Sequence, residues 1–146
     1  MDYSKPLEVI KSLLARQKFA VVSSNHDGQP YCNLVAFAET EDARNLIFTT
    51  RRNTSKYHNL TKDGRASLLI DNRTNLLADF GSATAITVIG KALELGTDSV
   101  KYYKEIFLKK HPNLSLFVND SINSIFSVKV SSYILAGFEK VERVDL

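Results

Sequence analysis

Cysteine is scarce in this sequence and tryptophan is absent. The one cysteine, Cys32, excludes an internal disulfide, and we expect it to pack as a small buried hydrophobic residue. No apolar run approaches the roughly 20 residues that a membrane-spanning helix needs. The first residues are of mixed charge and lack the apolar region of a signal peptide. We therefore expect a cytoplasmic protein without a membrane partner.

A strong excess of charge of one sign is also missing. The 146 residues include 19 basic and 16 acidic side chains, and the net charge of +3 is too balanced to indicate nucleic-acid binding. The three histidines, His26, His58 and His111, lack metal-ligand spacing. We expect no metal site and expect all three to be surface or partly packed residues. The length and the hydrophobic content of 44% fit one domain over residues 1–146.

The chain does contain a series of short apolar segments separated by turn signals. Asp27 and Gly28 form a strong hairpin signal, and Gly64 follows a short helical pattern and suits a left-handed helix end. A doubly wound parallel sheet would need a helix after nearly every strand. We therefore predict a mainly β fold, a closed or split antiparallel barrel with flanking helices. The predicted strands are 19–25, 31–39, 46–50, 65–71, 84–95 and 124–141, the last being one bent strand or a hairpin.

One stretch, FTTRRNTSKYHNL at residues 48–60, gathers hydroxyl groups and cations where an apolar strand ends and a helix begins. Thr54 and Ser55 fall at the helix start, where free backbone N–H groups and the positive end of the helix dipole favour an anion. Lys56 adds a point charge, and one of the two preceding arginines can add a planar donor fork. The stretch therefore predicts a site for a phosphate group.

The neighbouring side chains leave two questions open. Thr49 and Thr50 alternate across the strand, so only one of them is expected to face the anion. Either Arg51 or Arg52 could supply the guanidinium. An N-capped helix carrying solvated charges is the alternative interpretation of the whole stretch.

Three stretches in this order resemble the pyridoxamine 5′-phosphate oxidase superfamily of FMN-binding split barrels. They are DGQPYCNLVAFA (27–38), FTTRRNTSKYHNLTKDGRASLLID (48–71), and ITVIGKALEL with TDSVKYY (86–103). The resemblance implies a Greek-key split barrel and a homodimer with two FMN molecules at the subunit interface. It also implies that the phosphate lies at residues 48–56, and that the edge of the isoalloxazine ring meets residues 33–38 and, in part, the partner chain.

The resemblance can be carried over position by position. The family's phosphate cluster falls on Thr54, Ser55 and Lys56, and the arginine that commonly opens the flavin-contacting strand falls on Asn33. A glutamine that commonly contacts the flavin falls near Ala85, where Asn72, Arg73 or Asn75 could substitute for it. The predicted cofactor-binding residues are therefore Asn33, Leu34, Val35, Ala36, Thr49, Thr50, Arg51, Thr54, Ser55, Lys56 and Asn72.

The function implied by the resemblance is that of an FMN-dependent oxidoreductase, a reductase or oxidase of a small organic molecule. Pyridoxamine phosphate is not the expected substrate, because the family's tryptophan and arginine pair on the last strands are reduced here to Arg143. No side-chain acid or base is evident, so catalytic residues stay unassigned, as suits chemistry carried by a cofactor. The alternatives are a non-catalytic module of the same fold that binds flavin, deazaflavin or haem, and a purely structural dimer.

Overall fold

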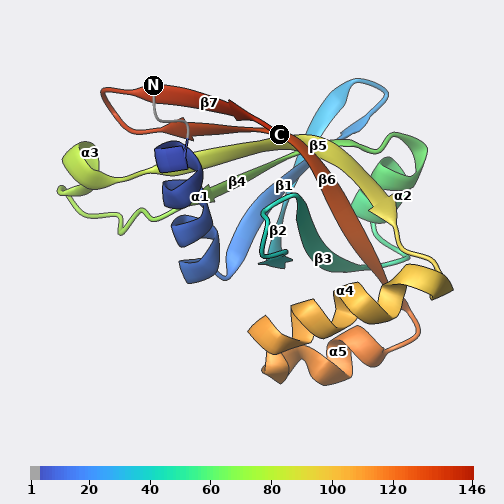
Figure 1. Ribbon diagram of the computed structural model, residues 1–146. Helices are drawn as coiled ribbons and strands as arrows, with labels where there is room; N and C mark the ends of the chain where they lie inside the picture. The colour runs from blue at the N-terminus through green and yellow to red at the C-terminus, as the bar shows by residue number, and fades with distance from the viewer. Residues whose placement is uncertain (1–3) are drawn as a thin grey trace.

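The computed structural model describes residues 4–146, in which six antiparallel strands close a barrel and a seventh strand extends it (Figure 1). The strand order is β3-β2-β1-β4-β5-β6-β7, and pairing of β3 with β6 closes the barrel. The strands are β1 (Phe19–His26), β2 (Gln29–Glu39), β3 (Asn45–Arg51), β4 (Arg65–Asp71), β5 (Ala85–Glu94), β6 (Asn123–Ala136) and β7 (Val141–Asp145). The helices are α1 (Ser4–Arg16), α2 (Ser55–Lys62), α3 (Asp79–Ser82), α4 (Thr97–Lys110), the 3-10 turn η1 (Pro112–Leu114) and α5 (Ser115–Asn119).

The predicted split barrel is confirmed, and of the two alternatives for residues 124–141, one bent strand or a hairpin, the hairpin is correct. The chain turns back after β6 to pair with β7, and at the turn the Gly137 N–H donates to the Lys140 carbonyl at 2.9 Å. β6 is long enough to pair with β3, β5 and β7. Its register against β5 shifts at Gly90, where a side chain would collide with the Lys129 carbonyl, so this bend of the barrel wall requires glycine.

Two hydrophobic clusters hold the helices against the barrel. The first fills the barrel and includes Ile10 and Leu14 of α1, so α1 closes one end of it. The second cluster lies on the outer side of the wall, where Phe107 of α4 and Val118 of α5 pack against Ile47 of β3. Figure 1 shows α4 and α5 together beside the ends of the strands. This second cluster fixes the two helices next to β2 and β3.

The β1–β2 hairpin has the tight turn that the sequence predicts. Asp27 and Gly28 both have positive φ, 49° and 86°, as a two-residue turn of this kind requires. The amide of Gly28 donates to Oδ1 of Asn25 at 3.3 Å. The hairpin extends beyond the barrel, so Cys32 is exposed, and the expectation that it is buried was wrong.

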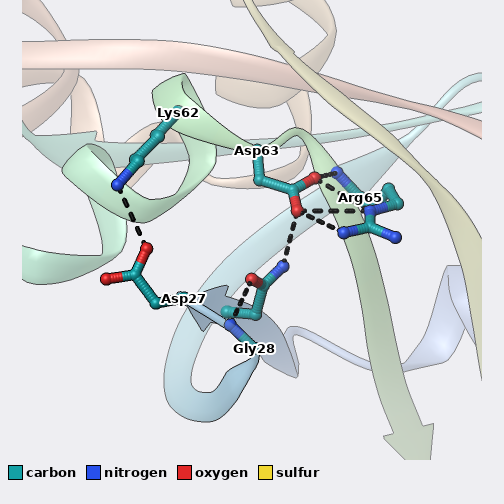
Figure 2. A network of polar contacts seen from close by, with 6 residues as sticks. Asp27, Gly28, Lys62, Asp63 and Arg65 are labelled. Atoms are coloured by element: carbon teal, nitrogen blue, oxygen red, sulfur yellow. Dashed lines mark hydrogen bonds and ion pairs between the residues drawn. The ribbon is translucent and has the colours of Figure 1, made fainter.

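A polar network ties this hairpin to the end of α2 (Figure 2). Asn25 donates through Nδ2 to Asp63 at 2.9 Å, and the Arg65 guanidinium binds the same carboxylate, with Nη2 to Oδ2 at 2.6 Å. Lys62 pairs with Asp27 at 3.2 Å. The hydrogen bonds from Arg65 and Asn25 hold the pKa of Asp63 well below its ordinary value.

The end of α2 differs from the expectation in one respect. Gly64 was predicted to take a left-handed conformation, but within residues 4–146 Gly28 is the glycine with positive φ. Gly64 is needed for space instead, since a Cβ there would lie 2.6 Å from the Ala92 carbonyl oxygen. α2 ends at Lys62, and the C-cap residue Asp63 has an extended backbone that leads toward β4.

Asp63→Asn should destabilise the protein at neutral pH and matter less in acid. Because the folded-state pKa of Asp63 lies well below the ordinary value of 3.8, the carboxylate stabilises the fold fully above pH 3.8, and this contribution shrinks as the pH falls from 3.8 toward the folded-state pKa. Urea unfolding at pH 7 and pH 3 measures the difference between the two proteins. Glu8→Gln, on the exposed face of α1, controls for loss of a negative charge. A difference between wild type and Asp63→Asn that does not shrink in acid would contradict this account.

Candidate cofactor site

A cavity of about 460 Å³ opens where β2 and β3 separate, within the size range of small-molecule sites. β2 pairs with β3 only from Phe37 to Glu39, and Phe37 lies opposite Phe48. Beyond that pair, Thr49 to Arg51 of β3 pair with β6, while Asn33 to Ala36 of β2 pair with β1. The cavity is lined by Lys18, Phe19, Leu34, Val35, Ala36, Thr49, Thr50, Arg51, Thr54, Lys56, Lys110, His111, Asn113, Leu114 and Phe117.

The separation leaves backbone groups available along one edge of β2. Among residues 4–146, no strand pairs with the β3-facing edge of residues 33–36. The N–H and C=O groups on that edge can therefore pair with a flat ligand, as they would with a neighbouring strand.

Eight of the eleven predicted cofactor-binding residues line this cavity together. They are Leu34, Val35, Ala36, Thr49, Thr50, Arg51, Thr54 and Lys56. They come from β2, β3 and the start of α2, which the fold brings to one place.

The other three predicted residues do not line the cavity. Ser55 is exposed as the first residue of α2, and Oδ1 of Asn33 is buried without a hydrogen-bond partner in residues 4–146. Asn72 follows β4 and holds the two ends of the β4–β5 connection together, since its Oδ1 accepts from the Thr84 amide at 2.7 Å. It lies at the opposite end of the seven-residue β4 from α2, roughly 20 Å along the strand.

The threonine hydroxyls already have acceptors for their hydrogens. Thr49 donates to the Ser124 carbonyl at 2.9 Å, and Thr54 donates to the Arg51 carbonyl at 2.8 Å. Because the hydrogen of Thr54 is used, the 3.2 Å contact between Thr50 and Thr54 has Thr50 as its donor. Both Thr49 and Thr50 line the cavity, where only one was expected to face it, and neither has a hydrogen left for an anion.

The donors that remain are at the first turn of α2. Lys56 is half-buried and has no carboxylate or carbonyl partner within residues 4–146, and its burial lowers its pKa. The backbone N–H groups of Ser55 and Lys56 also have no acceptor in that part of the chain. Arg51 is among the residues that line the cavity, whereas Arg52 is not and donates to the Ser121 carbonyl. The site can thus hold an anion at this end.

Another part of the cavity wall comes from the end of α4 and the segment that follows it, which sequence reasoning missed. His111 is 5% exposed, so the expectation of a surface or partly packed residue was wrong. Its neighbour Lys110 forms an ion pair with Glu39 at 2.6 Å, and burial lowers the pKa of Lys110. No motif marks these residues; only the packing of α4 on β2 and β3 brings them to the cavity.

Other kinds of site find no support in the described part of the chain. No group of three or more His, Cys, Asp or Glu side chains within residues 4–146 is placed to hold a metal ion. Over the same residues, none of the helices combines the length and apolar character needed to cross a bilayer.

A family model described as pyridoxamine 5′-phosphate oxidase matches residues 7–114, which is most of the chain. The chain belongs to the pyridoxamine 5′-phosphate oxidase family. The match contains β1 to β5, α2 and α4, and hence nearly all of the cavity wall. Among curated proteins, none matches this sequence.

Solved structures share the fold of this family member at low sequence identity. A haem-binding protein from Mycobacterium smegmatis superposes with a TM-score of 0.82 at 14% identity, over 92% of this chain and 55% of that one. An FAD-binding protein from Mesorhizobium loti superposes with a TM-score of 0.71 at 15% identity, over 96% of this chain and 94% of that one. General Stress Protein 26 from Bacillus anthracis superposes with a TM-score of 0.72 at 16% identity, over 95% of this chain and 97% of that one. The chain thus spans about half the length of the mycobacterial protein and nearly all of the other two.

Thr54→Ala should destabilise the protein by about 1 kcal/mol, because Thr54 is the N-cap of α2 and its Oγ1 accepts from the Tyr57 amide at 3.3 Å. Thr54→Ser keeps the hydroxyl and should retain most of the stability. Thr61→Ala, on the exposed side of the same helix, is the matched control and should change it by less than about 0.5 kcal/mol. Equal unfolding midpoints in urea for Thr54→Ala and wild type would show that the cap contributes nothing.

Proposed function

We propose that this protein is an oxidoreductase that binds FMN in the cavity between β2 and β3. The observation that carries the proposal is Lys56, a half-buried cation without a partner in residues 4–146, at a helix start beside the open edge of β2. The FMN phosphate carries close to two negative charges at neutral pH. An ammonium, two free backbone N–H groups and Arg51 are suited to bind it.

The rest of the cavity fits the ring of a flavin. Phe19, Leu34, Leu114 and Phe117 give it apolar walls, and the unpaired backbone edge of residues 33–36 can pair with the polar edge of the pyrimidine ring. When bound, FMN would supply hydride transfer. The residues of this chain bind and orient the cofactor and keep water from one face.

The proposed substrate is a small organic molecule other than pyridoxamine phosphate. β7 offers one arginine, Arg143, and its guanidinium is already paired with Asp145 at 2.9 Å. The tryptophan that the resemblance would require is absent from the sequence.

We also propose that the protein is a homodimer whose subunits share the flavin sites. Phe19 and Leu34 stand at the cavity with 58% and 68% of their surface exposed. Large apolar side chains exposed around a binding site are typical of a surface that another protein covers. Asn72 does not line the cavity of its own chain, so its predicted contact with the flavin would have to be made across the dimer.

Sedimentation equilibrium at micromolar concentration should give the mass of a dimer, with the flavin absorbance moving with it. A monomer that still carries flavin would show that one chain completes the site, and would overturn the shared arrangement.

Haem is the second candidate ligand, because the haem-binding protein from M. smegmatis is a close structural match. The visible spectrum of the purified protein separates a flavin from a haem, and mass spectrometry of the released ligand separates FMN from a deazaflavin. Turnover assays with reduced nicotinamide cofactors or oxygen then separate an enzyme from a non-catalytic flavin module.

The phosphate contact is tested by Lys56→Ala with two ligands. A hydrogen bond to a charged group contributes about 1.5–3 kcal/mol, so the Kd for FMN should rise roughly 10- to 100-fold. Riboflavin has no phosphate, so its binding should hardly change. Lys62→Ala is the matched control, since Lys62 is an exposed lysine on the same helix, paired with Asp27. Fluorescence titrations in which both ligands lose affinity equally, or FMN loses none, would refute the role of Lys56.

A further inference from the structure

His111 is held in one orientation by a hydrogen bond that also defines the tautomer of its neutral ring. Its Nε2 lies 2.6 Å from the carbonyl oxygen of Phe37. A carbonyl oxygen only accepts hydrogen bonds, so Nε2 carries the hydrogen and donates it. In the neutral imidazole the other nitrogen, Nδ1, is then an acceptor.

This second nitrogen has no partner in the described part of the chain and is open to the cavity. No group in residues 4–146 donates to Nδ1 of His111, and Nδ1 is not among the fully buried polar atoms of that region that lack a partner. His111 lines the cavity, although only 5% of the residue is exposed. The accessible side of the ring therefore belongs to the binding site. A ligand that displaces water from Nδ1 must supply a hydrogen-bond donor in its place, or Nδ1 is left unpaired.

The surrounding contacts fix His111 relative to β2. Its ring packs against Phe107 with a centroid distance of 4.9 Å. The ammonium of Lys110 donates to the Leu14 carbonyl and to Glu39, at 2.7 and 2.6 Å, and lies 4.1 Å from the centre of the Phe37 ring. Phe37 is also the residue at which β2 and β3 separate. The imidazole is thus positioned beside the strand whose open edge faces the proposed flavin.

We propose that Nδ1 of His111 accepts a hydrogen bond from the N3–H group of the bound flavin. This inference rests on the proposed function. The oxidised isoalloxazine ring has one N–H group, at N3 between two carbonyls, on the polar edge that residues 33–36 would meet. Lys56 and His111 then recognise opposite ends of one ligand, an anion at one end and a ring N–H donor at the other. Haem has no such donor, since its ionised propionates only accept.

The test compares FMN with its N3-methyl derivative, which lacks the N–H, in wild type and in His111→Phe. Phenylalanine keeps a flat ring against Phe107 but offers no acceptor at the place of Nδ1. In wild type, methylation should weaken binding by about 2- to 10-fold beyond its effect in His111→Phe, as expected for one neutral hydrogen bond. His26→Phe, in the exposed hairpin turn, is the matched control and should behave like wild type.

The outcomes separate this inference from the function on which it rests. An equal effect of methylation in wild type and His111→Phe, with FMN bound by both, would overturn the role of His111 and leave the flavoprotein intact. Wild type that binds neither flavin would overturn the proposed function and this inference with it.

A spectroscopic measurement on wild type keeps the inference testable if His111→Phe is unstable, since that variant leaves the Phe37 carbonyl unpaired. In ¹⁵N-labelled protein, Nε2 of His111 should give the signal of a protonated ring nitrogen, and Nδ1 that of an unprotonated one. FMN should shift the Nδ1 signal in the direction of hydrogen bonding, and N3-methyl FMN should not. The same shift with both flavins, or a protonated Nδ1 in the free protein, would refute the proposal.

Discussion

The parting of β2 and β3 after the Phe37–Phe48 pair is the constraint on which the site depends. Had the two strands stayed paired, their backbone groups would satisfy one another and no cavity would form. β3 instead continues along β6, which carries its last residues to the start of α2. The same divergence leaves room on the outer side of the wall, where α4 and α5 pack and bring His111 to the cavity. One change of strand partner thus creates the open edge, the anion-binding end and this part of the wall.

Two partly buried lysines border this cavity and show how the same side chain serves different purposes. Burial lowers the pKa of both. The charge of Lys110 is balanced by Glu39, and its ammonium also donates to the Leu14 carbonyl. These contacts hold α4 against β2. Lys56 has no such compensation in residues 4–146, and an unpaired cation in a half-buried place is unfavourable until an anion arrives. We infer a structural role for the first and a binding role for the second from this difference in partners.

Local signals in the sequence predicted the barrel and one end of the site well. The alternation in RASLLID defined β4 at its observed bounds, and the Thr-Ser pair marked the start of α2. What local signals could not predict depends on contacts between distant residues. The acceptor for Thr49 is a carbonyl of β6, and His111 meets Phe37 across 74 positions of the chain. Gly64 was misjudged for the same reason, because the group that demands glycine belongs to β5.

The exposed thiol of Cys32 has a practical consequence. It is the chain's one cysteine, and it lies on β2 directly before residues 33–36, whose β3-facing edge is open. A maleimide or nitroxide reagent therefore attaches at one defined place without any engineered substitution. In a twofold assembly two such labels report a single distance between equivalent hairpins. The same label, beside a coloured ligand, becomes an energy-transfer partner whose quenching follows occupancy of the cavity in real time.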